Sequence, residues 1–534
     1  MTNLKTLKAS RSLTQYDKDT LKKISLNTKI SSSFFEIVTI IAFLLIGIFR
    51  EHPILDLPAG MSIIILLTII MMIFSALSSW FYYWTYPFII FSFITMNYLS
   101  KNTALFRYRS YAYGLSYEKE KLKKYQISEI EKNSKNLVFR NQSKKNYLKT
   151  LDCWKKNTKQ KKPKLIVVLT SGGGSRSAVW TFTVLQHLDS VFHNRISKHT
   201  QMISGASGGM IGAAFYRSLV LNQLKKNIEN YNINYKFSKQ ISADLLNKLS
   251  VSAYSNDLFF RMQQFKVGNN TYTKDRGYAF EKQLNENTKQ ILDKPLRYFK
   301  RYEQCGYIPT MIFSPTIVND GRRLIISSQS MAFLCSSPGK TNFVNDIYEN
   351  IDFQTYFHGN KNIRFLSVLR MSATFPLVLP MVSMPTEPEM HIMDAGIRDN
   401  YGSKIGMEYL FSLKDWIKEN TSGVILLKIR DNKKILVGET VHEVSLFDKF
   451  TLPFGNIYGN FPRTQDFDQD ELLKIGAFGF DFPIDLVVFN LREDEKDRIS
   501  LSWHLTGQEK TKIEDALKSK GNLHALKQLN LLMK

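Results

Sequence analysis

The chain has 534 residues, 44% of them hydrophobic, and a formal net charge of +25, so it is long enough for one large α/β domain and an additional module. Three cysteines, Cys153, Cys305 and Cys335, are well separated and form no C-x-x-C pair, which argues against a disulfide scaffold and for a reducing compartment. The histidines are scattered, and neither H-E-x-x-H nor paired Cys/His spacing occurs, so we expect no metal site and no cofactor.

Two apolar runs near the N-terminus, residues 34–49 and 61–77, are close to the length that a helix needs to cross a bilayer. Residues 1–33 are polar and basic, and no small-residue cleavage site follows the first run, which excludes a cleavable signal peptide. A buried helical hairpin is the alternative. A third run, residues 80–99, is rich in aromatic residues and broken by Pro87; it could cross the bilayer or lie among the lipid headgroups.

Lysine and arginine are frequent on both sides of this apolar module. Because basic flanks stay in the cytoplasm, two such flanks imply an even number of crossings and a cytoplasmic C-terminal domain. We therefore expect an integral protein of a bacterial inner membrane. Its parts would be a basic N-terminus (1–33), a transmembrane module of two spans with 80–99 as a candidate third (34–100), a basic connector (101–162) and a large C-terminal domain (163–534).

The basic connector is rich in lysine, so it predicts an anionic partner. Beside a membrane module, anionic lipid is favoured over nucleic acid, because each basic residue near a lipid surface contributes about 1 kcal/mol. We therefore expect no nucleic-acid binding. A solvated, helix-rich connector is the alternative.

A buried strand followed by a glycine turn occupies residues 164–180. Residues 165–170 are apolar and β-branched, as in a central parallel strand, and the chain from Ser177 onward is compatible with a helix. Gly172, Gly173 and Gly174 therefore lie in a turn whose N–H groups can bind an oxyanion or a phosphate. A nucleotide-binding loop is disfavoured, because Arg176 and Ser177 stand where G-K-[ST] would be required. A turn without a ligand is the alternative.

Residues 205–209 read G-x-S-x-G, the spacing of a nucleophile elbow between a strand and a helix. The turn forces Ser207 into a strained backbone conformation, which requires small flanking residues such as Gly205 and Gly209. The hydroxyl is thereby exposed at a helix N-terminus, where the N–H of Gly208 can stabilise negative charge on a carbonyl oxygen. The pattern is also compatible with a tight helix entry that has no catalytic role.

Three further segments predict parts of an α/β sheet. Residues 311–318 and 322–328 read as two strands joined by a turn at residues 319–321, and residues 423–429 read as another buried strand. The polar stretch 223–306 shows no strong strand signal. It is interpreted as ordinary helical packing or as an insertion near the mouth of a site.

A short strand at residues 391–393 leads into Asp394. Ala395 and Gly396 then form a tight turn that holds the carboxylate at the carboxyl end of the strand, the edge where sites form in open α/β sheets. A serine hydroxyl needs a base within hydrogen-bond reach, and Asp394 can serve as that base without a histidine.

Together and in this order, the glycine turn, the elbow and the D-A-G turn resemble the patatin-like phospholipases over residues 163–430. S-G-G-G-x-R and D-A-G are similar to the related cytosolic phospholipases. The resemblance implies a three-layer α/β sandwich with a mostly parallel central sheet and a lipid acyl hydrolase that cleaves phospholipids or other lipid esters. It implies these roles: nucleophile Ser207, base Asp394, and oxyanion donors Gly172, Gly173, Gly174 and Gly208. Arg176 would lie near a lipid phosphate or support the loop.

Two other readings of these motifs compete with a Ser-Asp dyad. His442 and His504 follow Asp394, so either could complete the Ser-Asp-His order of an α/β-hydrolase esterase, but neither lies in a motif and the glycines lack a preceding histidine. A non-catalytic lipid-binding or scaffold protein is the second alternative, and the intact set of motifs argues against it.

Overall fold

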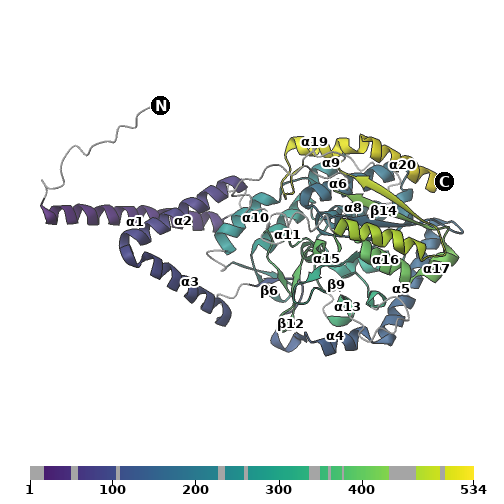
Figure 1. Ribbon diagram of the computed structural model, residues 1–534, viewed down its shortest axis with the longest axis horizontal. Coiled ribbons are helices and arrows are strands. Elements are labelled where there is room, and N and C mark those ends of the chain that lie inside the picture. Colours follow the sequence, from purple (N-terminus) through teal and green to yellow (C-terminus); the bar gives the residue numbers. More distant parts are fainter. Residues whose placement is uncertain are drawn as a thin grey trace. The chain divides into compact units, whose positions relative to one another are not determined.

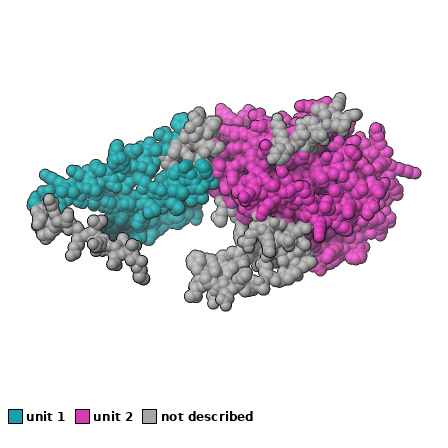
Figure 2. Space-filling view, turned by 90° about the horizontal axis from the view of Figure 1, so that it is seen from above, with its two compact units in different colours: residues 1–108, 250–261 teal, residues 109–249, 262–534 magenta. Residues whose placement is uncertain are grey.

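The computed structural model describes residues 17–49, 58–103, 109–226, 235–257, 263–335, 349–358, 362–375, 378–431, 465–492 and 499–534. The chain divides into two compact units (Figure 2). The smaller comprises residues 1–108 and 250–261, and the larger comprises residues 109–249 and 262–534. The larger unit contains the glycine turn, the elbow and the D-A-G turn.

The larger unit is built around a five-stranded sheet in the order β15-β14-β3-β4-β7, in which all neighbouring strands are parallel. The strands are β3 (Leu165–Thr170), β4 (Thr200–Gly205), β7 (Thr310–Phe313), β14 (Val424–Arg430) and β15 (Ile484–Asn490). Every residue of β3, β4 and β14 is buried, because these apolar runs are covered on both faces. The expected α/β class with a parallel sheet is confirmed.

Helices cover both faces of this sheet and give the unit three layers (Figure 1). Alternate residues of β3 enter two separate hydrophobic cores, with Ile166 and Val168 in one and Val167 and Leu169 in the other. The first core contains residues of α6 (Gly174–Val191), α8 (Ser207–Lys225), α19 (Gly507–Asp515) and α20 (Lys520–Leu532). The second contains residues of α5 (Leu137–Thr158), α16 (Ser403–Ser412) and α17 (Lys414–Asn420).

A second, mixed sheet has six short strands in the order β1-β11-β13-β8-β9-β10. They are β1 (Ser110–Tyr111), β8 (Thr316–Ile317), β9 (Arg323–Ile325), β10 (Asn350–Asp352), β11 (Val382–Ser383) and β13 (His391–Met393). The expected hairpin is present as the antiparallel pair β8–β9, but its first strand is divided. Pro315 has no N–H to continue the ladder, so β7 and β8 belong to different sheets.

Residues 109–162, expected as a basic connector, contribute to the larger unit instead. β2 (Lys123–Lys124) pairs with β12 (Thr386–Glu387), and α4 (Ile127–Ser134) and α5 follow. Tyr147, Leu151 and Trp154 of α5 are buried in the second core. Many lysines lie on the opposite side of the helix and dominate the composition of this segment. The sequence therefore suggests a solvated connector instead of a helix with a buried face.

The stretch 223–306 is mainly helical, as expected, with α9 (Tyr235–Ile241), α10 (Leu246–Ser252), α11 (Arg276–Asn287) and α12 (Lys300–Gln304). It also contains an antiparallel hairpin that we did not expect, formed by β5 (Gln264–Val267) and β6 (Asn270–Thr273). Gly268 at its turn has a φ of +58°, which glycine adopts without strain. The Gly-Asn pair at residues 268–269 is the hairpin signal that was missed.

The remaining short elements of the larger unit connect these parts. They are α7 (Arg195–His199), η4 (Lys119–Lys121), η6 (Leu296–Phe299), η7 (Ala332–Leu334), α13 (Phe353–Tyr356), α14 (Phe365–Ser372), α15 (Gly396–Asp399) and η8 (Ala516–Lys518). α15 begins two residues after Asp394 and therefore forms part of the candidate site.

The smaller unit contains α1 (Lys18–Ile48), α2 (Ala59–Phe81), η3 (Tyr82–Trp84), α3 (Thr85–Asn102) and the short π-helix η5 (Ala253–Asp257). α1 and α2 form an antiparallel pair, in which Lys29 Nζ donates to the Ser79 carbonyl and Trp80 Nε1 donates to Ser33 Oγ, both at 2.8 Å. α2 ends at Phe81, and the next residue, Tyr82, has a φ of +50°. The break in the aromatic run therefore lies at Tyr82. Pro87 is tolerated in the first turn of α3, where its missing N–H has no partner to lose.

Among the described residues, one helical stretch, Ala59–Asn102, is long and apolar enough to cross a membrane. Its most apolar window has a mean hydropathy of 2.6, and 11% of that window is buried. One such stretch is weak evidence for a membrane span. Residues 34–49, the other expected span, lie largely within α1, and their crossing stays a prediction.

Candidate active site

Ser207 lies at the junction of β4 and α8, where the elbow pattern placed it. Its φ is +48°, in the left-handed region that a residue with a Cβ adopts at a cost of about 1–3 kcal/mol. The next residue has to be glycine, since a Cβ on Gly208 would lie 1.9 Å from the Gly174 carbonyl oxygen. The strained elbow and the glycine turn are therefore packed directly against each other.

The glycine turn joins β3 to α6, and the helix begins at Gly174, three residues before the expected start. Gly174 makes this entry possible with a φ of +59°. The Gly172 N–H donates to the carbonyl oxygen of Asn400 at 3.1 Å and to its Oδ1 at 3.2 Å. Within the described part of the chain, the N–H groups of Gly173, Gly174 and Gly208 have no acceptor. These three groups can bind an oxyanion, whereas the Gly172 N–H is engaged.

Asp394 follows β13 and is held from three sides. Its N–H donates to the Thr374 carbonyl at 3.1 Å, its own carbonyl accepts from Thr316 Oγ1 at 3.0 Å, and its Oδ1 accepts from the Gly396 N–H at 2.7 Å. Ala395, between them, is fully buried. The D-A-G turn thus fixes the direction of the carboxyl group.

Burial raises the pKa of Asp394 to about 7, and hydrogen bonds from the Gly396 N–H and the Ser207 hydroxyl lower it from a still higher value. The Ser207 hydroxyl is therefore close enough to interact with this carboxyl group. Asp394 Oδ2 is buried and makes no hydrogen bond of good geometry. A carboxyl with a pKa near 7 and a free oxygen beside a hydroxyl is suited to proton transfer at neutral pH.

Arg176 forms an ion pair with Asp431, a residue that the sequence analysis did not identify. Its Nη2 and Nε donate to Asp431 Oδ2 at 2.6 and 3.1 Å, and its Nη1 donates to the Ile499 carbonyl at 2.8 Å. The backbone N–H of Asp431 donates to Ser171 Oγ at 2.8 Å. Both charged side chains are less than one tenth exposed. The signal for Asp431 is its position directly after the predicted strand at residues 423–429.

Two amide residues, Asn400 and Gln465, lie between the glycine turn and the D-A-G turn and were also missed. The Asn400 N–H donates to Gln465 Oε1 at 3.1 Å, and Gln465 Nε2 donates to the carbonyls of Gly396 and Ile397 at 3.0 and 2.6 Å. Gln465 lies in a helical stretch, residues 465–478. No local pattern marks either residue, because their contacts join distant segments.

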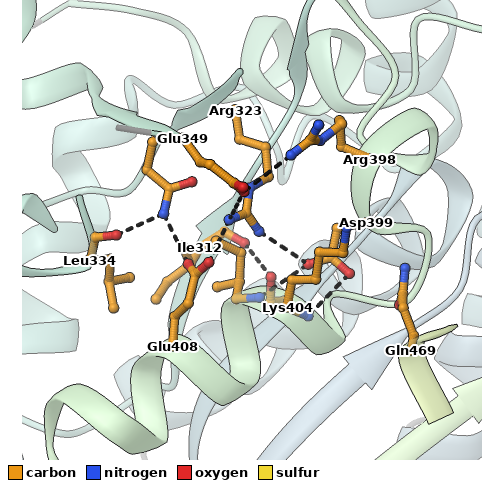
Figure 3. A network of polar contacts seen from close by, with 12 residues as sticks. Ile312, Arg323, Leu334, Glu349, Arg398, Asp399, Lys404, Glu408 and Gln469 are labelled. Atoms are coloured by element: carbon orange, nitrogen blue, oxygen red, sulfur yellow. Dashed lines mark hydrogen bonds and ion pairs between the residues drawn. The ribbon is translucent and has the colours of Figure 1, made fainter. Parts of the chain in front are cut away.

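A buried charge cluster holds the far end of α15 (Figure 3). Arg323 of β9 is fully buried and pairs with Glu408, with Glu349 at 3.6 Å and with Asp399 at 3.9 Å. Asp399 in turn accepts from the N–H of Ile405 at 3.1 Å at the start of α16. Burial opposes the charge of Arg323, but the surrounding carboxylates outweigh this effect and raise the pKa of Arg323. The cluster anchors the D-A-G turn to the second sheet.

The histidine alternative receives no support from the residues that can be placed. His504 is about half exposed, and its Nδ1 lies 2.6 Å from Asp244 Oδ1. His442 lies outside the described residues. In the described ranges, no group of three or more His, Cys, Asp or Glu residues is arranged to hold a metal ion.

The fold and these side chains define an α/β domain with a candidate serine nucleophile at the carboxyl edge of a parallel sheet. Residues 168–405 match the family model described as patatin-like phospholipase. The chain therefore carries a patatin-like phospholipase domain over these residues, as the resemblance of its motifs implied.

Solved structures give weaker likenesses. VipD from Legionella pneumophila is 13% identical, with 69% of this chain and 67% of that chain covered and a TM-score of 0.27. Human GIVD cytosolic phospholipase A2 is 11% identical, with 59% of this chain and 50% of that chain covered and a TM-score of 0.29. The comparison with curated proteins finds no match.

Proposed function

We propose that this protein is a membrane-anchored lipid acyl hydrolase that cleaves the acyl esters of phospholipids or related lipids with a Ser207–Asp394 dyad. The observation that carries the proposal is a buried carboxyl with a pKa of about 7, which is lowered in part by the hydroxyl of the serine on the strained elbow. Such a carboxyl can exchange a proton with the hydroxyl near neutral pH. The match of residues 168–405 to the patatin-like phospholipase model supports an ester substrate.

In the first step, the Asp394 carboxylate takes the proton of the Ser207 hydroxyl while Oγ attacks the ester carbonyl carbon. The carbonyl oxygen becomes an oxyanion, for which Gly173, Gly174 and Gly208 supply free N–H donors at the positive end of α8. When this intermediate collapses, the bond to the lipid alcohol breaks. Asp394 returns the proton to the alcohol, and the acyl group remains on Ser207.

In the second step, water takes the place of the serine. Asp394 accepts a proton from the water as it attacks the acyl-enzyme carbonyl, and the same N–H groups stabilise the second oxyanion. The bond to Oγ then breaks, the proton passes from Asp394 to Ser207, and the fatty acid is released. One carboxyl group therefore serves as base and acid in turn.

Arg176 is proposed as a support of the glycine turn rather than as a lipid phosphate ligand. Its donors are directed to Asp431 and to the Ile499 carbonyl, so the guanidinium is occupied within the protein. The ion pair thereby ties the start of α6 to the carboxyl end of β14.

Membrane anchoring through the N-terminal module is the second part of the proposal. The apolar stretch Ala59–Asn102 supports a span, and the basic segments on both sides of the module support a cytoplasmic catalytic domain. A bacterial inner membrane fits this arrangement. The lipid bilayer would then hold the hydrolase at the surface that contains its substrate.

Fatty-acid release from mixed phospholipid vesicles by the full-length protein tests the activity. Ser207→Ala should abolish release, while Ser218→Ala, a buried serine of the same helix, should retain it. A serine-reactive phosphonate should label Ser207 alone. Labelling that persists in Ser207→Ala would show that another residue is the nucleophile.

A further inference from the structure

Asn400 lies at the point where the glycine turn and the D-A-G turn meet. Two of its oxygens, the backbone carbonyl and Oδ1, accept the same Gly172 N–H. The fit is tight, because a Cβ on Gly172 would lie 2.6 Å from Asn400 Oδ1 and a Cβ on Gly396 would lie 3.0 Å from it. The Asn400 side chain therefore fills the space between the two turns.

Gln465 forms hydrogen bonds both with Asn400 and with the segment that contains the D-A-G turn. Its Oε1 accepts the Asn400 N–H, and its Nε2 donates to the carbonyls of Gly396 and Ile397. The helical stretch that contains Gln465 is fixed to β14, since Asp470 pairs with the fully buried Lys428 at 2.7 Å. Gln465 uses both ends of its amide here, Oε1 as an acceptor and Nε2 as a donor to two carbonyls, which a carboxylate at this position could not do.

We infer that Asn400 and Gln465 are positioning residues that lock the D-A-G turn against the glycine turn and so set where Asp394 lies relative to the oxyanion donors. The inference rests on the proposed dyad mechanism. By holding the Gly172 N–H, Asn400 leaves Gly173 and Gly174 as the free donors of the turn. Gln465 holds the turn that follows the base.

The contacts of Asn400 and Gln465 with the two turns are called the clamp below. They predict how a substitution at position 400 changes the pKa of Asp394. Asn400 Oδ1 and Asp394 Oδ1 both lie 3.0 Å from the Cβ position of Gly396, which places the two oxygens within about 6 Å of each other. Within the described residues, the groups that act on the Asp394 carboxyl are the Gly396 N–H and the Ser207 hydroxyl, and neither is charged. A new carboxylate at position 400 would therefore be the first charge to act on it.

Two conservative variants of the full-length protein test the clamp. Asn400→Asp keeps both acceptors for the Gly172 N–H and adds a negative charge, so we expect the midpoint of the pH–rate profile to rise by about one unit. Gln465→Glu keeps the acceptor for Asn400 and loses the donor to Gly396 and Ile397, so we expect kcat for a soluble short-chain ester to fall about tenfold, with KM little changed. Gln142→Glu, the same change at an exposed position of α5, should alter neither quantity.

Thermal unfolding of each variant shows that the protein is folded, and Ser207→Ala is measured in the same assays. A folded Asn400→Asp with the wild-type midpoint, or a folded Gln465→Glu with the wild-type kcat, would overturn the clamp. If Asn400→Asp does not fold, Gln465→Glu decides alone, because it lies on another element. Activity that persists in Ser207→Ala would instead overturn the dyad, so the two failures are distinguishable.

Discussion

Asp394 is the residue on which the proposed chemistry depends, and its acidity makes the proposed dyad testable. A general base must be ionised, and burial places the pKa of this carboxyl at about 7. We therefore expect kcat/KM for a soluble ester to rise with pH through about 7 and then level off. A midpoint near 4, typical of an exposed carboxyl, would show that Asp394 is not the base.

The two residues of the dyad should also act as one unit. Ser207→Ala and Asp394→Asn should each reduce hydrolysis to background, and the double variant should be scarcely worse than either single one, because each change removes the same step. His504→Ala serves as the control and should retain activity, since that side chain pairs with Asp244. A loss of about a thousandfold in His504→Ala would favour a triad.

The same carboxyl should lower stability at high pH. Its pKa is raised from 3.8 to about 7 in the folded state, so it favours folding below pH 4, and this contribution is lost as the pH rises to 7. At pH 8 the buried charge costs roughly 4 kcal/mol. Asp394→Asn should therefore raise the melting temperature more at pH 8 than at pH 5. Asp468→Asn, at an exposed position, is the control, and an equal shift at both pH values would contradict the assignment.

At the level of elements, the Arg176–Asp431 pair joins the start of α6 to the end of β14. Removing one partner of a buried ion pair leaves the other charge unpaired, so Arg176→Met should lower the free energy of unfolding by about 3–5 kcal/mol. Lys518→Met, in the exposed pair with Asp515, should leave the free energy of unfolding nearly unchanged. Denaturant unfolding measures both.

The kinetics of Arg176→Met distinguish the two roles considered for this residue. As a loop support, Arg176 should affect phospholipid and uncharged short-chain ester alike. A folded, equally stable variant with a raised KM for phospholipid alone would show instead that the guanidinium binds a lipid phosphate.

At the level of the whole molecule, α5 determines how far the chain can be shortened from its N-terminus before the larger unit no longer folds. A chain shortened to begin at Arg109 keeps every strand of both large sheets, so it should fold and hydrolyse a soluble ester. A chain that begins at Lys161 loses Tyr147, Leu151 and Trp154, each worth about 2–5 kcal/mol when buried, and should not fold. Circular dichroism and ester hydrolysis compare the two shortened chains. A folded and active chain that begins at Lys161 would contradict the role of α5.

Membrane anchoring is tested by extraction. The full chain should stay in the membrane fraction at high salt or alkaline pH and leave it only with detergent, because the apolar stretch Ala59–Asn102 contributes far more transfer energy than a basic patch. The chain that begins at Arg109 should be soluble and work poorly on vesicles. Release of the full chain by salt alone would exclude a span, and cleavage of the catalytic domain by protease outside intact cells would reverse the proposed topology.

The sequence by itself determined the class of fold, the order of the motifs and the residues proposed for the dyad. Each of these depends on local constraints. The apolar run of β3, the small residues around Ser207 and the D-A-G turn can be recognised in the sequence, because the backbone geometry at each place restricts the types of neighbouring residues. The hairpin at residues 264–273, which we did not expect, could have been predicted in the same way from its Gly-Asn turn.

Only the tertiary structure decided which N–H groups are free, how acidic Asp394 is, and that residues 109–162 belong to the larger unit. Asn400, Asp431 and Gln465 reach the site from segments far apart in the chain, and the pKa of Asp394 follows from what buries it. Burial and long-range hydrogen bonds depend on how segments pack against one another. A local pattern of residue types does not contain that information, and so the support of the site became visible only once the chain was folded.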